Sequence, residues 1–201
     1  MNKQEKMWSS GFGTDYHTRN KFEDRSIFWM DVLGHRVLGD AHSVLEPGAG
    51  KGENLVAIHE ARKLAFGSPT STQCLGIEVN EQAYKELASR TGARLGAFLD
   101  IPLQQQYPLV ITRGFLMHVP SAALNPTLAK IYNSSSKYIC IAEYYSPVRR
   151  EVEYHGQGSA LWIDDFAHKI MEMYPDLKLL DYGFKYHKDN GYDLTYFLLE
   201  K

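Results

Sequence analysis

Cysteine and long apolar runs are scarce in this sequence, and each shortage excludes a class of protein. Among 201 residues there are only two cysteines, Cys74 and Cys140, with no C-x-x-C pair and no cluster with histidine. We therefore expect no metal site, and we expect both cysteines to be reduced and buried because each lies in a predicted interior strand. No stretch approaches the roughly 18 apolar residues of a membrane span, and no apolar signal core follows the polar residues 1–6. These absences predict a soluble, cytoplasmic protein.

An excess of charge of either sign is also missing. Lys and Arg number 22 against 24 Asp and Glu, which gives a net charge of −2 with neutral histidine. Because a basic field is typical of proteins that bind nucleic acid, we expect neither nucleic acid nor a membrane as a partner, but a small-molecule substrate. With 44% hydrophobic residues, the chain is long enough to bury one sizeable core. We therefore predict a single domain over residues 1–201.

Glycine is concentrated in one short run, residues 44–54 (V-L-E-P-G-A-G-K-G-E-N). The apolar lead-in predicts a buried strand that ends at Glu46, and Gly48, Gly50 and Gly52 form the turn into a helix. Glycine permits positive φ and lets a ligand lie directly on the backbone, while the helix N-terminus favours a polar or negative ligand group. The spacing E-x-G-x-G-x-G fits neither the G-x-G-x-x-G dinucleotide fingerprint nor the G-x-x-x-x-G-K-[ST] phosphate loop.

A second strand with an acid at its tip follows at residues 72–80 (T-Q-C-L-G-I-E-V-N), before the helix-like stretch 81–88. The acid is Glu78. A carboxylate in this position can accept hydrogen bonds from both hydroxyls of a ribose, as it does in dinucleotide-binding folds. Two strands that end in acids, in this order, favour a nucleoside-containing ligand.

These two segments resemble the first motifs of class I S-adenosylmethionine-dependent methyltransferases. The resemblance implies an α/β, Rossmann-like fold with a seven-stranded, mostly parallel sheet, helices on both faces and an N-terminal arm. It implies S-adenosylmethionine as cofactor and S-adenosylhomocysteine (SAH) as product. It also implies cofactor contacts from Glu46, Gly48, Ala49, Gly50, Gly52 and Asn54 at the methionine end, Glu78 and Val79 at the ribose, Asp100 and Ile101 at the adenine, and Arg113 after the fourth strand.

The sequence departs from that family in two places. The fourth strand begins Y-P-L-V at residues 107–110, where the family usually carries an aspartate. The [DN]-P-P-[YF] motif, which grips a planar amino group, is absent. Methylation of a nucleobase amino group is therefore not expected.

Residues 1–40 are expected to form an arm and a flanking helix ahead of a core at residues 41–201. Residues 7–20 mix aromatic and small residues without helix or strand period, which predicts either an arm over the cofactor cleft or a simple terminal anchor. Within this stretch, Tyr16 is a candidate substrate ligand, and the guanidinium of Arg19 could clamp the cofactor carboxylate with two hydrogen bonds. An amphipathic helix is predicted for the residues that follow.

Two residues are candidates for a general base. His118 follows the strand predicted at residues 109–112, and histidine titrates close to neutral pH. Glu143 ends the strand predicted at residues 137–142, and ligands of open α/β sheets bind beyond the carboxyl ends of strands. Each has a structural alternative, because His118 could pack under its own turn and Glu143 could cap its strand.

Further substrate contacts are expected after the fifth strand, at Tyr144 and Tyr145. Residues 146–161 are polar and contain glycine, which predicts an irregular substrate-side loop. Arg149 and His155 are its candidate substrate ligands, although a solvated surface role is the alternative for Arg149. Two final strands are expected near the end of the chain, the last of them antiparallel.

Three other segments resemble the methylases associated with pseudaminic acid biosynthesis: F-G-x-x-Y-x-x-R-N, I-A-E-Y-Y-x-P and Y-P-D-L-K-L-x-D-Y-G-F. This resemblance implies methyl transfer to an oxygen, or secondarily a nitrogen, of a small polar, sugar-like metabolite. Two alternatives remain, an NAD(P)-dependent oxidoreductase of similar fold and a non-catalytic protein that binds S-adenosylmethionine. A monomer or a homodimer is expected.

Overall fold

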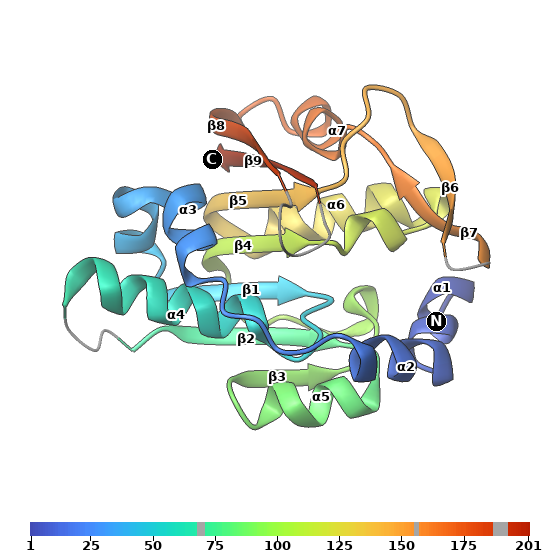
Figure 1. The fold of residues 1–201 in the computed structure, drawn as a ribbon. Coiled ribbons are helices and arrows are strands. Elements are labelled where there is room, and N and C mark those ends of the chain that lie inside the picture. The colour runs from blue at the N-terminus through green and yellow to red at the C-terminus, as the bar shows by residue number, and fades with distance from the viewer. Residues whose placement is uncertain (68–70, 155–156, 187–192) are drawn as a thin grey trace.

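A twisted, mostly parallel sheet forms the centre of the molecule (Figure 1). The computed structural model describes residues 1–67, 71–154, 157–186 and 193–201. Within them, a seven-stranded sheet has the order β3-β2-β1-β4-β5-β9-β8, parallel from β3 to β5, with β9 antiparallel to β5 and β8. The strands of this sheet are β1 (Ser43–Pro47), β2 (Gln73–Glu78), β3 (Gly92–Leu95), β4 (Tyr107–Arg113), β5 (Ser135–Glu143), β8 (Lys178–Lys185) and β9 (Leu194–Glu200). This architecture confirms the predicted fold class.

β1 lies inside the parallel part of the sheet, and its residues are buried on both faces. It pairs with β2 on one side and with β4 on the other. Successive side chains of a strand point to opposite faces, so Val44 enters one core and Leu45 the other, and both are fully buried. β1 therefore delivers Glu46 to the edge at which the parallel strands end.

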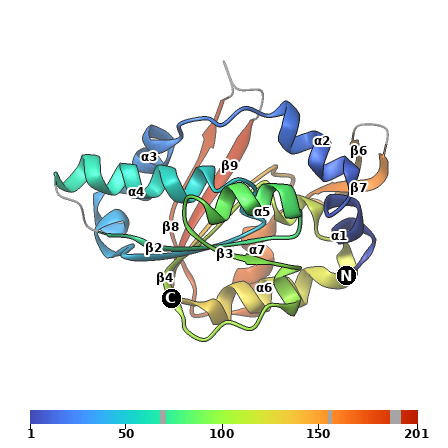
Figure 2. The ribbon, with the colours of Figure 1, turned by 90° about the horizontal axis from the view of Figure 1, so that it is seen from below.

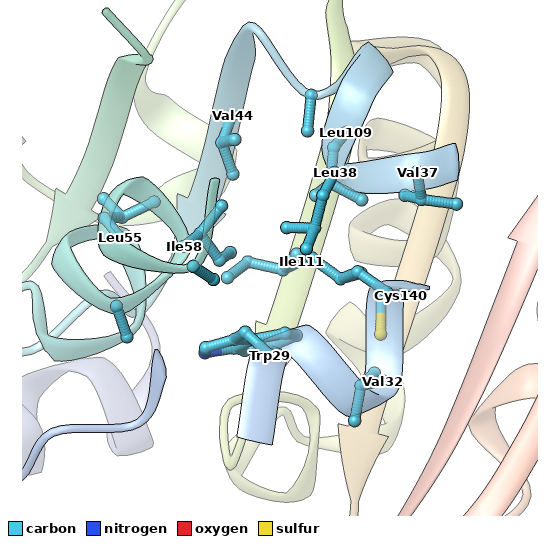
Figure 3. Close-up of a cluster of buried hydrophobic side chains, with 14 of the residues drawn as sticks. Trp29, Val32, Val37, Leu38, Val44, Leu55, Ile58, Leu109, Ile111 and Cys140 are labelled. Atoms are coloured by element: carbon cyan, nitrogen blue, oxygen red, sulfur yellow. The ribbon is translucent and has the colours of Figure 1, made fainter. Parts of the chain in front are cut away.

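Helices cover both faces of the sheet. The main ones are α3 (Ser26–Asp40), α4 (Glu53–Phe66), α5 (Glu81–Ala88), α6 (Ser121–Ser134) and α7 (Phe166–Met173). Figure 3 shows Trp29 of α3 and Ile58 of α4 meeting Val44 and Ile111 of the sheet, which is the first core. The second core joins α6 and α7 to the opposite face. The kink inside α3 falls at Gly34, which has φ 61°.

The N-terminal arm is helical, which its sequence pattern did not indicate. It consists of α1 (Lys3–Trp8) and α2 (Gly11–Arg19). Asn2 Oδ1 accepts a hydrogen bond from the Glu5 N–H (2.9 Å), and the Glu5 carboxylate accepts one from the Asn2 N–H (2.6 Å). This capping box starts a helix too short to display an apolar period. Figures 1 and 2 place the arm at the edge of the sheet towards which β2 and β3 point.

The segment predicted as an irregular loop contains a β-hairpin. β6 (Arg150–Tyr154) pairs antiparallel with β7 (Gln157–Ile163) as a separate two-stranded sheet. The prediction of irregular structure was wrong because only Leu161 and Trp162 of the described side chains are buried here, so the strand period is hidden among polar residues. In Figure 1 the hairpin lies at the same edge of the sheet as the arm.

The predictions about the cysteines and the last two strands are confirmed, except that Cys74 is only half-buried. Both cysteines are free, Cys140 fully buried and Cys74 half-buried. Two terminal strands are present, and the last of them is antiparallel to its neighbours. No helix among the described residues is long and apolar enough to cross a membrane.

Candidate functional site

A cavity of about 220 Å³ lies at the carboxyl ends of β1, β2 and β4. Its walls come from four places: the glycine turn after β1, the end of β2, the segment after β4, and the helices of the arm. The carboxyl edge of a parallel sheet is where open α/β folds bind ligands. The arm therefore forms part of the cavity wall. This position is the one expected of an arm that covers the cleft, which is the first of the two roles predicted for it.

The glycine turn supplies a bare stretch of cavity wall. Gly48 and Gly50 have φ 66° and 54°, a region that disfavours other residues, and both line the cavity together with Ala49. A Cβ on Gly48 would lie 2.4 Å from Cδ2 of Phe115. Gly52 also has positive φ, but it does not line the cavity. A side chain at Gly48 would therefore collide with the segment after β4.

Glu78 joins the glycine turn to the end of β2. Its Oε2 accepts a hydrogen bond from the Gly50 N–H (2.8 Å), and its Oε1 accepts from the N–H groups of Val79 (2.8 Å) and Asn80 (2.7 Å). Burial raises the pKa of Glu78, and these three hydrogen bonds oppose that rise. Oε2 keeps acceptor capacity for a ligand hydroxyl, because a carboxylate oxygen has two lone pairs and only one is used.

Glu46 acts on the cavity through Asn54. Its side chain is only 1% exposed and does not line the cavity, but its Oε1 accepts a 2.6 Å hydrogen bond from Nδ2 of Asn54, which does. The Asn54 Oδ1 accepts in turn from Nη1 of Arg25 (3.2 Å) and Nε1 of Trp29 (3.3 Å). Burial raises the pKa of Glu46 to about 8. This network therefore fixes the orientation of the Asn54 amide at the cavity wall.

Of the two arginines that the sequence indicated, Arg19 and Arg113, only Arg113 lines the cavity, and Arg25 joins it there. Arg19 is exposed at the end of α2 and does not line the cavity, whereas Arg25 and Arg113 do. Arg25 forms an ion pair with Glu53 (2.6 Å). Arg113 ends β4 and stacks on Phe28 with its guanidinium carbon 5.4 Å from the ring centre. Arg25 was missed because nothing in its local sequence points to a ligand.

Aromatic residues of the arm form part of the cavity wall. Trp8, Tyr16 and His17 all line it, and Asn80 holds the arm by donating from Nδ2 to the Trp8 carbonyl (3.0 Å) and the Thr14 hydroxyl (3.2 Å). Burial lowers the pKa of His17 to about 4, so this imidazole is neutral at physiological pH. Because the backbone N–H of Asn80 also binds Glu78, the arm and the end of β2 share one anchor.

His118 and Glu143, the two candidate bases, have different positions. His118 lies in the short helix η2 (Leu116–His118), lines the cavity and contacts Trp8 with ring centres 4.6 Å apart. Glu143 is buried away from it and accepts hydrogen bonds from the backbone N–H groups of Phe115 (3.1 Å) and Leu116 (3.0 Å). Burial raises its pKa to about 7. Glu143 therefore supports the segment that carries His118, which corrects the prediction that it faces the ligand.

Of the candidate substrate ligands after β5, some line the cavity and others do not. Tyr144 lines the cavity, while Tyr145 is 44% exposed beside Phe197 and does not. Arg149 forms an ion pair with Asp164 (2.9 Å) and donates to the Val119 carbonyl (3.0 Å), which makes it a structural brace. His155 lies outside the described residues.

The loop after β3 lines the cavity with residues other than those predicted for the adenine contact. Asp100 is exposed, and neither it nor Ile101 lines the cavity; Ala97, Phe98 and Leu99 do so instead. This loop is held by Lys130 of α6, whose Nζ donates to the carbonyls of Phe98 (2.6 Å), Leu99 (3.2 Å) and Ile101 (2.5 Å). Lys130 was not identified from the sequence because it lies 29 or more residues away from each of these carbonyls.

Comparison with solved structures relates this geometry to known proteins. The magnesium protoporphyrin IX methyltransferase of Synechocystis PCC 6803, solved with SAH, matches 98% of this chain over 97% of its own, with 11% identity and a TM-score of 0.69. The 1,6-didemethyltoxoflavin N1-methyltransferase of Burkholderia thailandensis matches 94% of the chain over 86% of its own, with 14% identity and a TM-score of 0.62. The chain has the Rossmann-like fold of these methyltransferases.

A further solved structure shares this methyltransferase fold. An S-adenosylmethionine-dependent methyltransferase from Clostridium acetobutylicum matches 99% of the chain over 98% of its own, with 8% identity and a TM-score of 0.63. No family model and no curated protein matches the sequence. The resemblance to pseudaminic acid-associated methylases therefore stays a prediction.

Within the methyltransferase fold, the predicted site residues separate into two groups. Those that line the cavity are Tyr16, Gly48, Ala49, Gly50, Asn54, Glu78, Val79, Arg113, His118 and Tyr144. Those described but outside the lining are Arg19, Glu46, Gly52, Asp100, Ile101, Glu143, Tyr145 and Arg149. The residues at the first two strand ends are well represented in the first group, because their placement follows from the strand order alone.

Proposed function

We propose that this protein is an S-adenosylmethionine-dependent methyltransferase acting on a small polar metabolite. The observation that carries the proposal is the direct hydrogen bond between the Gly50 N–H and Glu78 Oε2 in the cavity wall (2.8 Å). It joins a bare glycine turn to a buried carboxylate on one surface. The turn suits close approach by the amino-acid end of the cofactor, and the carboxylate suits its ribose hydroxyls.

The same contact argues against a dinucleotide such as NAD. A pyrophosphate binds to backbone N–H groups at a helix N-terminus. Here the Gly50 N–H is already bonded to an acidic side chain, and Glu53 begins the helix that follows the turn. Two negative phosphates would be repelled by these carboxylates, whereas the uncharged ribose of S-adenosylmethionine can donate hydrogen bonds from its hydroxyls to Glu78.

The chemistry of the proposed reaction needs little beyond positioning and a proton acceptor. When bound, S-adenosylmethionine supplies a methyl group on a positively charged sulfur that a nucleophile attacks in line. Phe115, Met117 and Trp8 of the cavity wall would exclude water from the reacting atoms. His118 is the candidate to take the proton from the acceptor hydroxyl as the oxygen–carbon bond forms. An oxygen acceptor is preferred to a nitrogen because only a hydroxyl of high pKa needs such a base.

Calorimetric titration with SAH tests the proposed cofactor. We expect the parent protein to bind SAH and not NAD, and Glu78→Ala to weaken SAH binding by about tenfold to a hundredfold, the value of a hydrogen bond to a charged group. Glu81→Ala is the matched control, since that side chain is 69% exposed. Equal SAH affinity in the Glu78→Ala protein, or preferential binding of NAD, would overturn the proposal.

The acceptor is proposed to be a sugar-like metabolite of a pseudaminic or related nonulosonic acid pathway. Support comes from the sequence resemblance described above and from polar residues that line the cavity, namely Asn2, Gln4 and Glu5 of the N-terminal segment and Tyr144 after β5. The test is mass spectrometry of a pathway extract incubated with the protein and isotopically labelled S-adenosylmethionine. A labelled methyl in a sugar intermediate is expected, and label only in unrelated metabolites would contradict the assignment.

A further inference from the structure

Arg113 presents to the cavity a guanidinium that has no ion-pair partner among the described residues. It ends β4 and lines the cavity, and its side chain lies against the ring of Phe28. Among the described residues, no oxygen accepts a hydrogen bond from its buried Nε, and no ion pair to this guanidinium is formed, although Glu46, Tyr16 and Glu53 lie near enough to affect its charge. A buried guanidinium is costly unless it is paired, so this arrangement calls for an anion from outside the chain.

Other partly buried arginines of the protein are compensated. Arg25 is bonded to Glu53 at 2.6 Å, and Arg149 to Asp164 at 2.9 Å. Their side chains are each 18% exposed, and Arg113 is also half-buried, but only Arg25 and Arg149 have an ion-pair partner among the described residues. Arg113 is therefore the arginine of the described cavity wall whose charge is available to a ligand.

Glu46 does not neutralise Arg113, although it is close enough to affect its charge. Its Oε1 is bonded to Asn54, and its pKa is raised to about 8, so the carboxyl is mostly protonated at neutral pH. Burial and the neighbouring Arg25 lower the pKa of Arg113 to about 10, which still leaves the guanidinium charged. Arg113 therefore keeps its positive charge at the cavity wall.

We propose that Arg113 is the anion-binding group of this cavity and takes a carboxylate. The planar fork of a guanidinium matches the two oxygens of a carboxylate. A phosphate dianion fits less well, because Glu53 and Glu78 also line the cavity and Arg25 is already paired. The inference rests on the proposed function for the identity of the ligands: the carboxylate belongs either to the amino-acid part of the cofactor or to the acceptor.

The first experiment compares SAH with 5′-methylthioadenosine, which has the same nucleoside but lacks the amino-acid group. Both are titrated calorimetrically into the parent protein, Arg113→Met and Arg113→Lys, with Arg36→Met as control because that side chain is 64% exposed. If the carboxylate is the cofactor's, Arg113→Met weakens SAH by about tenfold to a hundredfold and leaves methylthioadenosine unchanged. Arg113→Lys keeps the positive charge but lacks the planar guanidinium, so its SAH affinity is expected to lie between those of the parent protein and Arg113→Met. If Arg113→Met does not fold, Arg113→Lys alone provides the test.

The second experiment tests whether the carboxylate that binds Arg113 belongs to the acceptor. Saturation-transfer NMR on the SAH-saturated protein compares glucuronate, which carries a carboxylate, with glucose, which does not. If the carboxylate is the acceptor's, glucuronate gives a signal that Arg113→Met removes, while SAH affinity stays as in the parent. The proposal is overturned if the variants change neither SAH nor glucuronate binding, or if they weaken methylthioadenosine as much as SAH. Titration of the parent protein with SAH tests the proposed function separately.

Discussion

Replacing Glu46 with glutamine should remove a large part of the pH dependence of folding. Glu46 is 1% exposed, and burial raises its pKa from 4.5 to about 8. Between these two values the folded protein keeps the Glu46 proton while the unfolded chain has lost it. Because the unfolded state then binds fewer protons, stability falls as the pH rises through this window. Glutamine does not titrate and contributes no such fall.

The magnitude follows from the pKa of Glu46. Each pH unit inside the window corresponds to about 1.4 kcal/mol, and the fall levels off near the folded-state pKa, so we expect wild type to lose about 2 kcal/mol relative to Glu46→Gln between about pH 6 and pH 8. The substitution preserves the local contact, since the glutamine carbonyl can still accept from Asn54 Nδ2, as Oε1 does at 2.6 Å. Its amide nitrogen takes the place of Oε2, which has no partner among the described residues.

Urea unfolding of both proteins at fixed ionic strength, followed by circular dichroism, measures this difference. Glu78, Glu53 and Glu143 also have raised pKa values, but they are common to both proteins and cancel in the comparison. The control is Glu81→Gln, at a side chain that is 69% exposed. If the free-energy difference between wild type and Glu46→Gln stays constant from pH 6 to pH 8, the reasoning about this buried acid is refuted.

Three further substitutions test the walls of the cavity. Gly48→Ala should abolish SAH binding and reduce stability by about 2–4 kcal/mol, since φ is 66° and the new Cβ would lie 2.4 Å from Cδ2 of Phe115; calorimetry and urea unfolding measure the two effects. Lys130→Met should weaken SAH by about tenfold in the same titration, because the carbonyls that bind its Nζ, within residues 98–101, lose their donor. Glu143→Ala should lower the free energy of unfolding by about 1–3 kcal/mol, because backbone N–H groups at the start of η2 lose their acceptor.

Each of these substitutions has a counterpart on the surface. Gly11→Ala places a Cβ with nothing within 4 Å, Lys85→Met alters a side chain that is 70% exposed, and Glu172→Ala one that is 66% exposed. We expect all three controls to bind SAH and unfold as wild type does. If a control variant loses as much SAH affinity or unfolding free energy as its buried counterpart, the effect does not come from the cavity wall.

The sequence by itself determined the elements whose signals are local. Short apolar runs that end in acids placed Glu46 and Glu78 at one edge of a parallel sheet, and the spacing of Gly48 and Gly50 identified the turn between strand and helix. These features depend on neighbouring residues and on one general rule about parallel sheets. The glycine turn and the end of the second strand therefore followed without coordinates, and the fold class followed from the family resemblance that these two motifs carry.

Tertiary structure decided which charged side chains meet the cavity and which support it from behind. The sequence indicated Arg19 and gave no sign of Arg25, but it is Arg25 that reaches Asn54 and Glu53 across the fold. Glu143 looked like a ligand because it ends a strand, yet it binds backbone N–H groups 26–28 residues away. Such choices depend on distances between segments far apart in the chain. No periodicity or spacing encodes them, because burial and hydrogen bonding become defined only when the segments pack together.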